Sequence, residues 1–254
     1  MKKRVIIAAA ACCFATPAFA EDGDWTGAYV GVSAGYNVSN SKSATTLSGN
    51  WSAETAGRRD FVIANSAAKQ SVKDANYGVQ AGFNAQIGEI FVLGAEADFA
   101  LLGGRTSYNR SATYAPGAPT APTTYTFENR IDPKASYAVK GKLGIAIDKT
   151  LIYATGGWGW TRAELGADIS SSANYKKASK LNHTFNGYVV GGGIEHKFAQ
   201  NISARIDYTY TDQGNTTYQT SYVTGSAFQS PAYGETIRQD LKMHQVRVGM
   251  NFHF

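Results

Sequence analysis

Three features of the 254-residue sequence predict an all-β fold, an eight-stranded antiparallel up-and-down transmembrane β-barrel with four long extracellular loops. Apolar and polar residues alternate with a period of two in eight segments. Short and long connections alternate between these segments. After the first 20 residues, no apolar run approaches the roughly 20 residues that a membrane-spanning helix needs. Strands with one apolar face and one polar face satisfy all three observations.

The start of the chain has the features of an export signal. A basic start at residues 2–4, an apolar stretch at 5–15 and an A-x-A site at 18–20 predict that residues 1–20 are removed. Removal takes Lys plus Arg from 24 to 21 against 19 Asp plus Glu, so the net charge falls from +5 to +2. Cys12 and Cys13 are lost with the signal, which excludes disulfides and thiolate metal sites. The remaining residues, 21–254, are expected to form one barrel domain without affinity for nucleic acid.

The first four expected strands have clear alternation. In residues 27–37 the even-numbered positions are mostly apolar or aromatic. In residues 76–87, 90–102 and 135–147 the odd-numbered positions have this character, and the positions between them are mostly Gly, Ala or polar residues. A strand places alternate side chains on opposite faces, so each of these segments has one face suited to lipid.

The last four expected strands place their apolar residues at even-numbered positions. In residues 151–162 three glycines dilute the pattern, although Ile152 and Trp158 still share a face. Residues 183–198 and 202–212 alternate more regularly. Residues 241–254 alternate as far as the terminal Phe254, which is typical of the closing strand of an outer-membrane barrel.

The connections predict the orientation of the barrel. Outer-membrane barrels have short periplasmic turns and long extracellular loops, so both termini are expected in the periplasm. The short connections are 88–89, 148–150 and 199–201, and the expected loops are 38–75, 103–134, 163–182 and 213–239.

The inward face of the expected strands carries four acids and four bases. Opposite charges on neighbouring strands offset each other's desolvation, and the interior of an eight-stranded barrel is just wide enough for side chains to fill it. We therefore expect a plugged polar lumen without a wide pore. Glu96 and Asp98 are expected beside Lys140 and Lys142, and Arg205 and Asp207 beside Glu195 and Arg247.

Several strand segments resemble a known family. They are Trp25-Thr26-Gly27-Ala28-Tyr29-Val30-Gly31, Val92-Leu93-Gly94-Ala95-Glu96-Ala97-Asp98-Phe99, Tyr153-Ala154-Thr155-Gly156-Gly157-Trp158, Asp207-Tyr208-Thr209-Tyr210-Thr211-Asp212 and Val246-Arg247-Val248-Gly249-Met250-Asn251-Phe252. These segments are similar to the porin-like surface antigens and haemin-binding proteins of alphaproteobacteria, which are OmpA-like transmembrane barrels. The resemblance implies a location in the outer membrane of a Gram-negative bacterium and a role in supporting the envelope. It also implies that Phe254 is the signal read by the barrel-assembly machinery.

Three functions are compatible with the sequence. The first is a structural surface barrel that supports envelope integrity and contacts ligands through its loops. Its outward face would meet outer-membrane lipids and lipopolysaccharide, and the sequence does not identify a partner for the loops. The second is a haemin receptor, as in some members of the family, with His183 and His244 as candidate ligands beside the loop tyrosines. The third is a porin for small solutes.

Catalysis is not expected. Gly31-Val32-Ser33-Ala34-Gly35 matches the G-x-S-x-G motif, but that motif needs a strand-to-helix turn and Ser33 is expected in the middle of a strand. The four histidines are not grouped, and the spacing of His and carboxylates does not suggest a metal site. We therefore predict a protein that is not an enzyme, with no catalytic or metal-binding residue and no cofactor apart from the haemin alternative.

Overall fold

The computed structural model describes residues 24–117 and 121–254, so the expected signal at residues 1–20 lies outside the described part. The strands that form the barrel are β1 (Gly27–Gly49), β2 (Ala68–Ile87), β3 (Phe91–Leu102), β5 (Thr123–Ile147), β6 (Thr150–Ser171), β7 (Lys176–Ala199), β8 (Ile202–Gln219) and β10 (Tyr233–His253). They pair antiparallel in the order β3-β2-β1-β10-β8-β7-β6-β5, and pairing of β3 with β5 closes the ring. The all-β barrel is thus confirmed.

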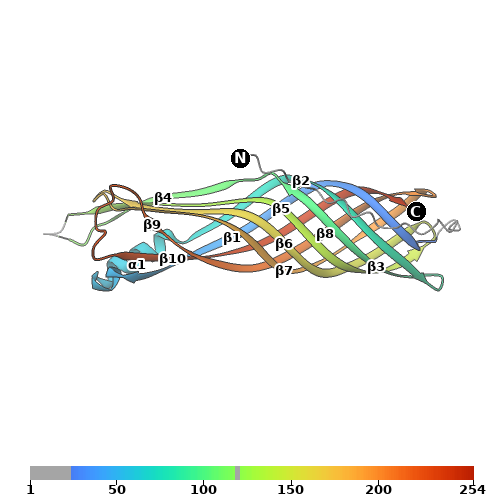
Figure 1. Ribbon diagram of the computed structural model, residues 1–254, viewed down its shortest axis with the longest axis horizontal. Coiled ribbons are helices and arrows are strands. Elements are labelled where there is room, and N and C mark those ends of the chain that lie inside the picture. The colour runs from blue at the N-terminus through green and yellow to red at the C-terminus, as the bar shows by residue number, and fades with distance from the viewer. Residues whose placement is uncertain (1–23, 118–120) are drawn as a thin grey trace, which may run out of the picture.

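The remaining elements lie toward one end of the barrel. Strand β4 (Thr106–Tyr114) pairs with β5, and the short β9 (Ser221–Tyr222) pairs with β7. Helices η1 (Asn50–Ala53) and α1 (Ala56–Ser66) connect β1 to β2 at the end opposite the C-terminus (Figure 1). The Thr55 side chain caps α1 by accepting a hydrogen bond from the Arg58 backbone N–H. None of the described helices is long and apolar enough to cross a membrane.

The strands are much longer than the sequence pattern predicted. All eight expected segments are strands, but most of the expected loops are strands too. For example, β1 continues to Gly49 and β2 begins at Ala68, so much of the expected loop 38–75 is a hairpin. The expected loop 163–182 is likewise strand except at residues 172–175. The prediction of four long loops was therefore wrong over most of their length.

The barrel has two halves of opposite polarity. In the half that holds the C-terminus, large apolar side chains such as Val79, Leu143 and Val248 are exposed on the outer wall. In the other half, apolar side chains fill the interior. This inner core comprises Val72, Leu102, Ile131, Ala163, Leu165, Ala167, Phe185, Tyr218, Ile237, Leu241 and Met243. The first half is suited to lipid and the second to water, because apolar surface is most stable where water is absent.

The change of polarity explains why the longer strands were missed. In β6 the exposed Trp158 has an even number, whereas the buried Leu165 has an odd number. The apolar positions thus move from the outer face to the inner face within one continuous strand. In β5 a bulge between Pro133 and Ala135 reverses the facing of the odd-numbered residues. In β6 the phase of the apolar alternation therefore changes at the middle of the strand, whereas in β5 the bulge keeps the apolar residues at odd-numbered positions while they change face.

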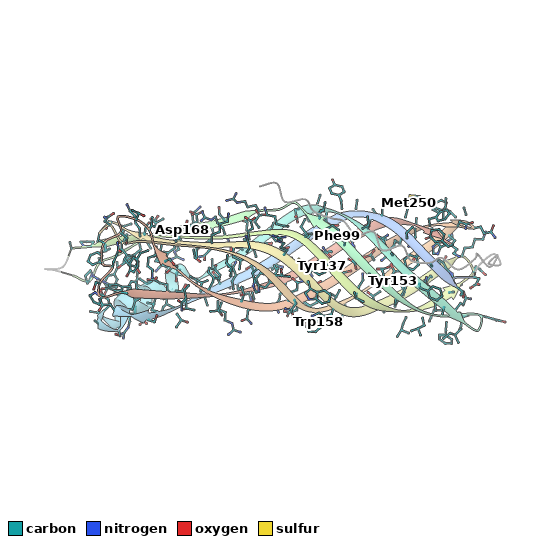
Figure 2. The ribbon with its side chains drawn as sticks, viewed as in Figure 1. Phe99, Tyr137, Tyr153, Trp158, Asp168 and Met250 are labelled. Atoms are coloured by element: carbon teal, nitrogen blue, oxygen red, sulfur yellow. The ribbon has the colours of Figure 1, made fainter. Side chains whose placement is uncertain are left out.

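Aromatic side chains mark the boundary between the two halves. Phe99, Tyr137 and Trp158 lie near the middle of the long axis, whereas Asp168 lies well inside the half that holds α1 (Figure 2). The Tyr137 ring stacks on Trp160 with centroids 5.4 Å apart. Tyrosine and tryptophan favour the interface between lipid and water. We call the half that holds the C-terminus, up to the aromatic band, the membrane half. We call the half with the apolar interior the outer half.

Candidate functional site

The inward charges of the membrane half form a closed circuit of six ion pairs. Glu96 contacts the amine of Lys140 at 3.0 Å and the guanidinium of Arg205 at 2.5 Å. Lys140 also contacts Asp98 at 2.8 Å, and Asp98 contacts Arg247 at 3.0 Å. Asp207 completes the circuit, with Arg247 at 3.3 Å and Arg205 at 3.1 Å. Each charge therefore has two neighbours of opposite sign.

The circuit crosses the lumen. Glu96 and Asp98 are on β3 and Lys140 is on the adjacent β5. Arg205 and Asp207 are on β8 and Arg247 is on β10, on the opposite side of the ring. The side chains of the circuit are at most 7% exposed, so each ion pair is stronger than it would be in water, and each unpaired charge would be costly.

A second layer lies between the circuit and the C-terminal end. The Lys142 amine lies 3.5 Å from Glu96 and 4.0 Å from Glu195. It donates a hydrogen bond to the hydroxyl oxygen of Tyr29 at 2.7 Å, and that hydroxyl donates to Glu96 at 2.7 Å. The amine also lies over the ring of Tyr153, 4.8 Å from its centroid. Two carboxylates, a tyrosine hydroxyl and an aromatic ring thus fix the position of the Lys142 amine.

Glu195 is the centre of the last polar layer. It accepts hydrogen bonds from the Ser203 hydroxyl and from the Asn251 amide at 2.6 Å, and His253 Nε2 lies 3.2 Å away. The His253 ring packs edge-on against Trp25 with centroids 5.7 Å apart. Trp25 belongs to a small apolar cluster with Val92, Ala146, Leu151 and Tyr153. Side chains therefore fill this part of the lumen from the circuit to the periplasm-facing end predicted from the sequence.

All eight charged residues expected in the lumen lie inside it, but some pair differently from the expectation. Arg205 reaches across to Glu96 rather than to its strand neighbour Glu195. Arg247 contacts Asp207 as expected and Asp98 in place of Glu195. Sequence reasoning missed His253 as a partner of Glu195. The sequence did contain the information needed, because His253 and the inward-facing Arg247 are both odd-numbered residues of one strand and therefore share a face.

A polar cluster is buried near the tip of the outer half. Glu235 on β10 pairs with the Lys177 amine at 2.8 Å. It also accepts hydrogen bonds from Trp51 Nε1 at 2.7 Å, from the Thr220 hydroxyl at 2.6 Å and from the Tyr175 hydroxyl. Burial favours the neutral acid, but the hydrogen bonds from Lys177 and Thr220 outweigh it and hold the pKa of Glu235 below its usual value. Burial, with Glu235 beside it, raises the pKa of Tyr175.

A small cavity of about 70 Å³ lies beside this cluster. Trp51, Tyr125, Tyr175 and Tyr233 form much of its wall. Since a water molecule occupies roughly 30 Å³ of liquid, the cavity has room for about two waters and is far too small for a porphyrin.

The two candidate haemin ligands lie on opposite faces of the wall. His183 is inward on β7, and its ring packs against Phe185 with centroids 4.8 Å apart. His244 is outward on β10 and shares a hydrogen bond of 2.8 Å with the Tyr208 hydroxyl. The structure does not bring them together.

The candidate loop tyrosines are Tyr108, Tyr114, Tyr125, Tyr175, Tyr218, Tyr222 and Tyr233. Several already use their hydroxyl groups. Tyr233 donates to Glu54 at 2.8 Å, Tyr222 to the Phe228 carbonyl at 2.9 Å and Tyr218 to Gln239 at 2.8 Å. These hydroxyls stabilise the tip through hydrogen bonds within the protein.

Two further residues from the sequence have clear positions. Ser33 lies in the middle of β1 and faces inward, so the strand-to-helix turn of a nucleophile motif is not present there. Phe254 is exposed at the C-terminal end, where its ring packs against Phe252 at 5.1 Å. Its backbone N–H donates to the Ala28 carbonyl at 2.9 Å, which fastens the chain end to β1.

The sequence as a whole matches a family model described as "Outer membrane protein beta-barrel domain" over residues 6–254. The chain belongs to this family. It is an outer-membrane β-barrel protein, as the resemblance of its strand segments indicated.

Its relatives include surface immunogens of Brucella. The chain is 27% identical to the 31 kDa outer-membrane immunogenic protein of Brucella melitensis biotype 1, over 99% of this chain and 100% of the relative. It is 22% identical to the 25 kDa outer-membrane immunogenic protein of Brucella abortus biovar 1, over 100% and 99%. Among solved structures, it is similar to the outer membrane protein OprG from Pseudomonas aeruginosa, with 11% identity, a TM-score of 0.45 and coverage of 92% and 99%.

Proposed function

We propose that this outer-membrane β-barrel is a closed surface protein that supports the envelope and does not conduct solutes. The lumen circuit carries this proposal. Ion pairs join β3 and β5 to β8 and β10 across the barrel, and an apolar cluster around Trp25 fills the lumen beyond Glu195. A solute could pass only by separating buried charge pairs, which is unfavourable because each charge would be left without its partner in the barrel interior. This barrier disfavours the porin alternative.

The proposed orientation places the outer half outside the cell and both termini in the periplasm. The polar exterior and apolar core of the outer half support it, because these suit a wall surrounded by water. At the opposite end the strands are joined only by tight connections, such as residues 88–90 and 148–149. Outer-membrane barrels have their short turns on the periplasmic side.

The outer half would act as a rigid projection rather than as a set of mobile loops. Its strands are paired almost to the tip, and Glu235 ties β10 to the helix η1 through Trp51 and to β7 through Lys177. A rigid projection would present one fixed surface to the surroundings of the cell. The immunogenic Brucella relatives are consistent with a surface of this kind.

Cysteine labelling tests the orientation. The mature chain is expected to lack cysteine, so Ala173→Cys at the β6–β7 tip and Glu89→Cys at the β2–β3 turn each supply one thiol. A membrane-impermeant maleimide should label Ala173→Cys in intact cells and Glu89→Cys only after the outer membrane is permeabilised. The reverse result would overturn the orientation.

The envelope role is tested by deletion. Cells of the source bacterium that lack the protein should become more sensitive to detergent, and the wild-type chain should restore resistance. A Glu96→Gln variant, in which we expect a weakened circuit, serves as the matched comparison and should restore less. Unchanged resistance in the deletion strain would contradict a structural role.

A further inference from the structure

Four lysines surround a small polar patch on the outer wall, just beyond the aromatic band. Lys42 on β1 lies directly opposite Lys69 on β2. Two residues further along, Asn40 pairs with Ser71 on one side and with Lys242 of β10 on the other. Lys73 follows on β2, opposite Val38. Because alternate residues of a strand share a face, Lys42, Lys69, Lys73 and Lys242 frame Asn40 and Ser71. We call this group the lysine patch.

Three of these lysines form no ion pair within the described part of the chain. Among the described residues, no carboxylate lies within 4.0 Å of the amines of Lys42, Lys69 or Lys73. The fourth, Lys242, is paired with Asp212 at 2.7 Å. The nearby Asp240 accepts a hydrogen bond from the Lys42 backbone N–H at 2.5 Å. Like charges directly opposite each other on neighbouring strands are destabilising, so the Lys42 and Lys69 pair has an unexplained cost in the isolated protein.

The other side of the outer half is arranged differently. On β5, β6 and β7 several outward-facing bases form ion pairs with acidic residues. Arg130 contacts Glu128 at 3.0 Å and Asp168 at 2.8 Å. Lys134 contacts Asp132, and Lys180 lies 3.8 Å from Glu164. Arg130, Lys134 and Lys180 are thus paired, whereas Lys42, Lys69 and Lys73 on β1 and β2 form no ion pair among the described residues.

The patch lies at the depth of lipid headgroups. On β1, the exposed aromatic residue Tyr36 is four residues from Asn40, or about 13 Å along a strand. On β10, His244 follows Lys242 by two residues and packs on the ring of Tyr210 on β8. Headgroups lie just outside such a band, where amphipathic rings meet the polar region of the membrane.

Shallow apolar grooves lie on the membrane half of the same strands. One groove, of about 830 Å³, is lined by side chains that include Val30, Val79, Phe99, Met250 and Phe252 of β1, β2, β3 and β10. A neighbouring groove of about 900 Å³ is lined in part by Val32, Tyr77 and Val248. A ligand with phosphates at one end and several acyl chains at the other would meet complementary surface along its whole length.

We propose that the lysine patch binds the phosphate groups of an anionic glycolipid of the outer leaflet, with its acyl chains in the grooves below. The phosphate lies over Asn40 and Ser71, and Lys42, Lys69 and Lys73 supply the missing counter-charge. The lipid thereby removes the repulsion between Lys42 and Lys69. This assignment rests on the proposed orientation, because such a glycolipid would meet the patch only if the outer half faces outward.

Binding of purified lipid A to the refolded protein in neutral detergent tests the proposal. The variant K42Q/K69Q/K73Q removes three charges from the patch, and K134Q/R162Q/K180Q removes three from the opposite side as a matched control. At about 1 kcal/mol per basic residue near an anionic surface, the patch variant should bind roughly 100-fold more weakly, and the control should bind like the wild type. Enzymatically dephosphorylated lipid A should bind wild type as weakly as lipid A binds the patch variant. Inorganic phosphate alone should not compete at millimolar concentration. Equal affinity of the two variants, or equal affinity for the two lipids, would overturn the proposal.

A single substitution gives a second, sign-dependent readout. Lys69→Gln should raise the unfolding midpoint in neutral detergent without lipid, because it relieves the repulsion from Lys42. It should lower the midpoint relative to wild type when lipid A is present, because a ligand contact is lost. A shift of the same sign in both conditions would refute the assignment. Neither experiment depends on orientation in cells or on closure of the lumen, so their failure would leave the proposed function standing.

Discussion

Replacing Glu96 by Gln probes the lumen circuit at its most connected point. The Glu96 side chain is fully buried and contacts Lys140 at 3.0 Å, Arg205 at 2.5 Å and Lys142 at 3.5 Å. The substitution preserves shape and removes one negative charge. Lys140 and Arg205 keep Asp98 and Asp207 as partners, but Lys142 is left with Glu195 at 4.0 Å.

The expected loss is about 3 kcal/mol in the free energy of unfolding. Removing one partner of a buried pair typically costs about 3–5 kcal/mol, and the partners that remain put Glu96→Gln at the lower end of this range. Urea unfolding in phospholipid vesicles, followed by tryptophan fluorescence, measures it. The control Glu164→Gln breaks an exposed pair with Lys180 and should cost less than about 1 kcal/mol.

A second substitution separates charge imbalance from lost packing. Lys142→Met in the Glu96→Gln background removes the cation with the weakest remaining partner, so it should recover part of the lost stability. The coupling between the two sites follows from a double-mutant cycle. A loss below about 1 kcal/mol for Glu96→Gln, or a further loss in the double variant, would refute the view that the circuit holds the barrel closed.

Three further predictions concern the outer half. Leu165→Ala, in its apolar core, should cost about 2–5 kcal/mol and open the hairpins to protease, whereas the exposed Thr126→Ala should leave protection unchanged. Equal protection of both variants would mean that the core is not packed. Because the pKa of Glu235 is lowered in the folded protein, its stabilisation is complete above about pH 4.3, the unfolded value, and is lost as the pH falls through the folded value. Cleavage of the tip by an acid protease should therefore rise as the pH falls below about 4 in wild type and show less pH dependence in Glu235→Gln. Haemin should cause no Soret shift with the refolded protein, because His183 and His244 face opposite ways and several tip tyrosine hydroxyls are occupied; a shift lost in His183→Ala or His244→Ala would restore the receptor hypothesis.

The sequence predicted the membrane half well because lipid imposes one simple rule there. Every residue on the outer wall must be compatible with hydrocarbon, so the alternation through Val246, Val248 and Met250 is unbroken. In the outer half the apolar residues face the interior instead, and this reversed alternation begins where the alternation of the membrane half ends. In β10 the inward Leu241 and Ile237 continue the strand with the apolar face reversed. The polar residues between them gave the impression of a loop.

The lumen contacts were predictable only between neighbouring strands. Sequence order and the expected pairing placed Lys140 beside Glu96, since β3 and β5 adjoin in the barrel. The contacts of Arg205 with Glu96 and of Arg247 with Asp98 cross the lumen, and strand order alone does not give the tilt and stagger that bring those side chains together. The long guanidinium side chains make such reach possible.

Single-channel recording tests the closed lumen most directly. The refolded wild-type barrel, inserted into a planar lipid bilayer beside a porin of known conductance, should give no steady unitary current over the voltages at which the porin conducts. We expect the interlocked charges from Glu96 to Arg247 and the apolar cluster around Trp25 to block a continuous water path. Stable, reproducible current steps from the wild-type protein would contradict the central claim.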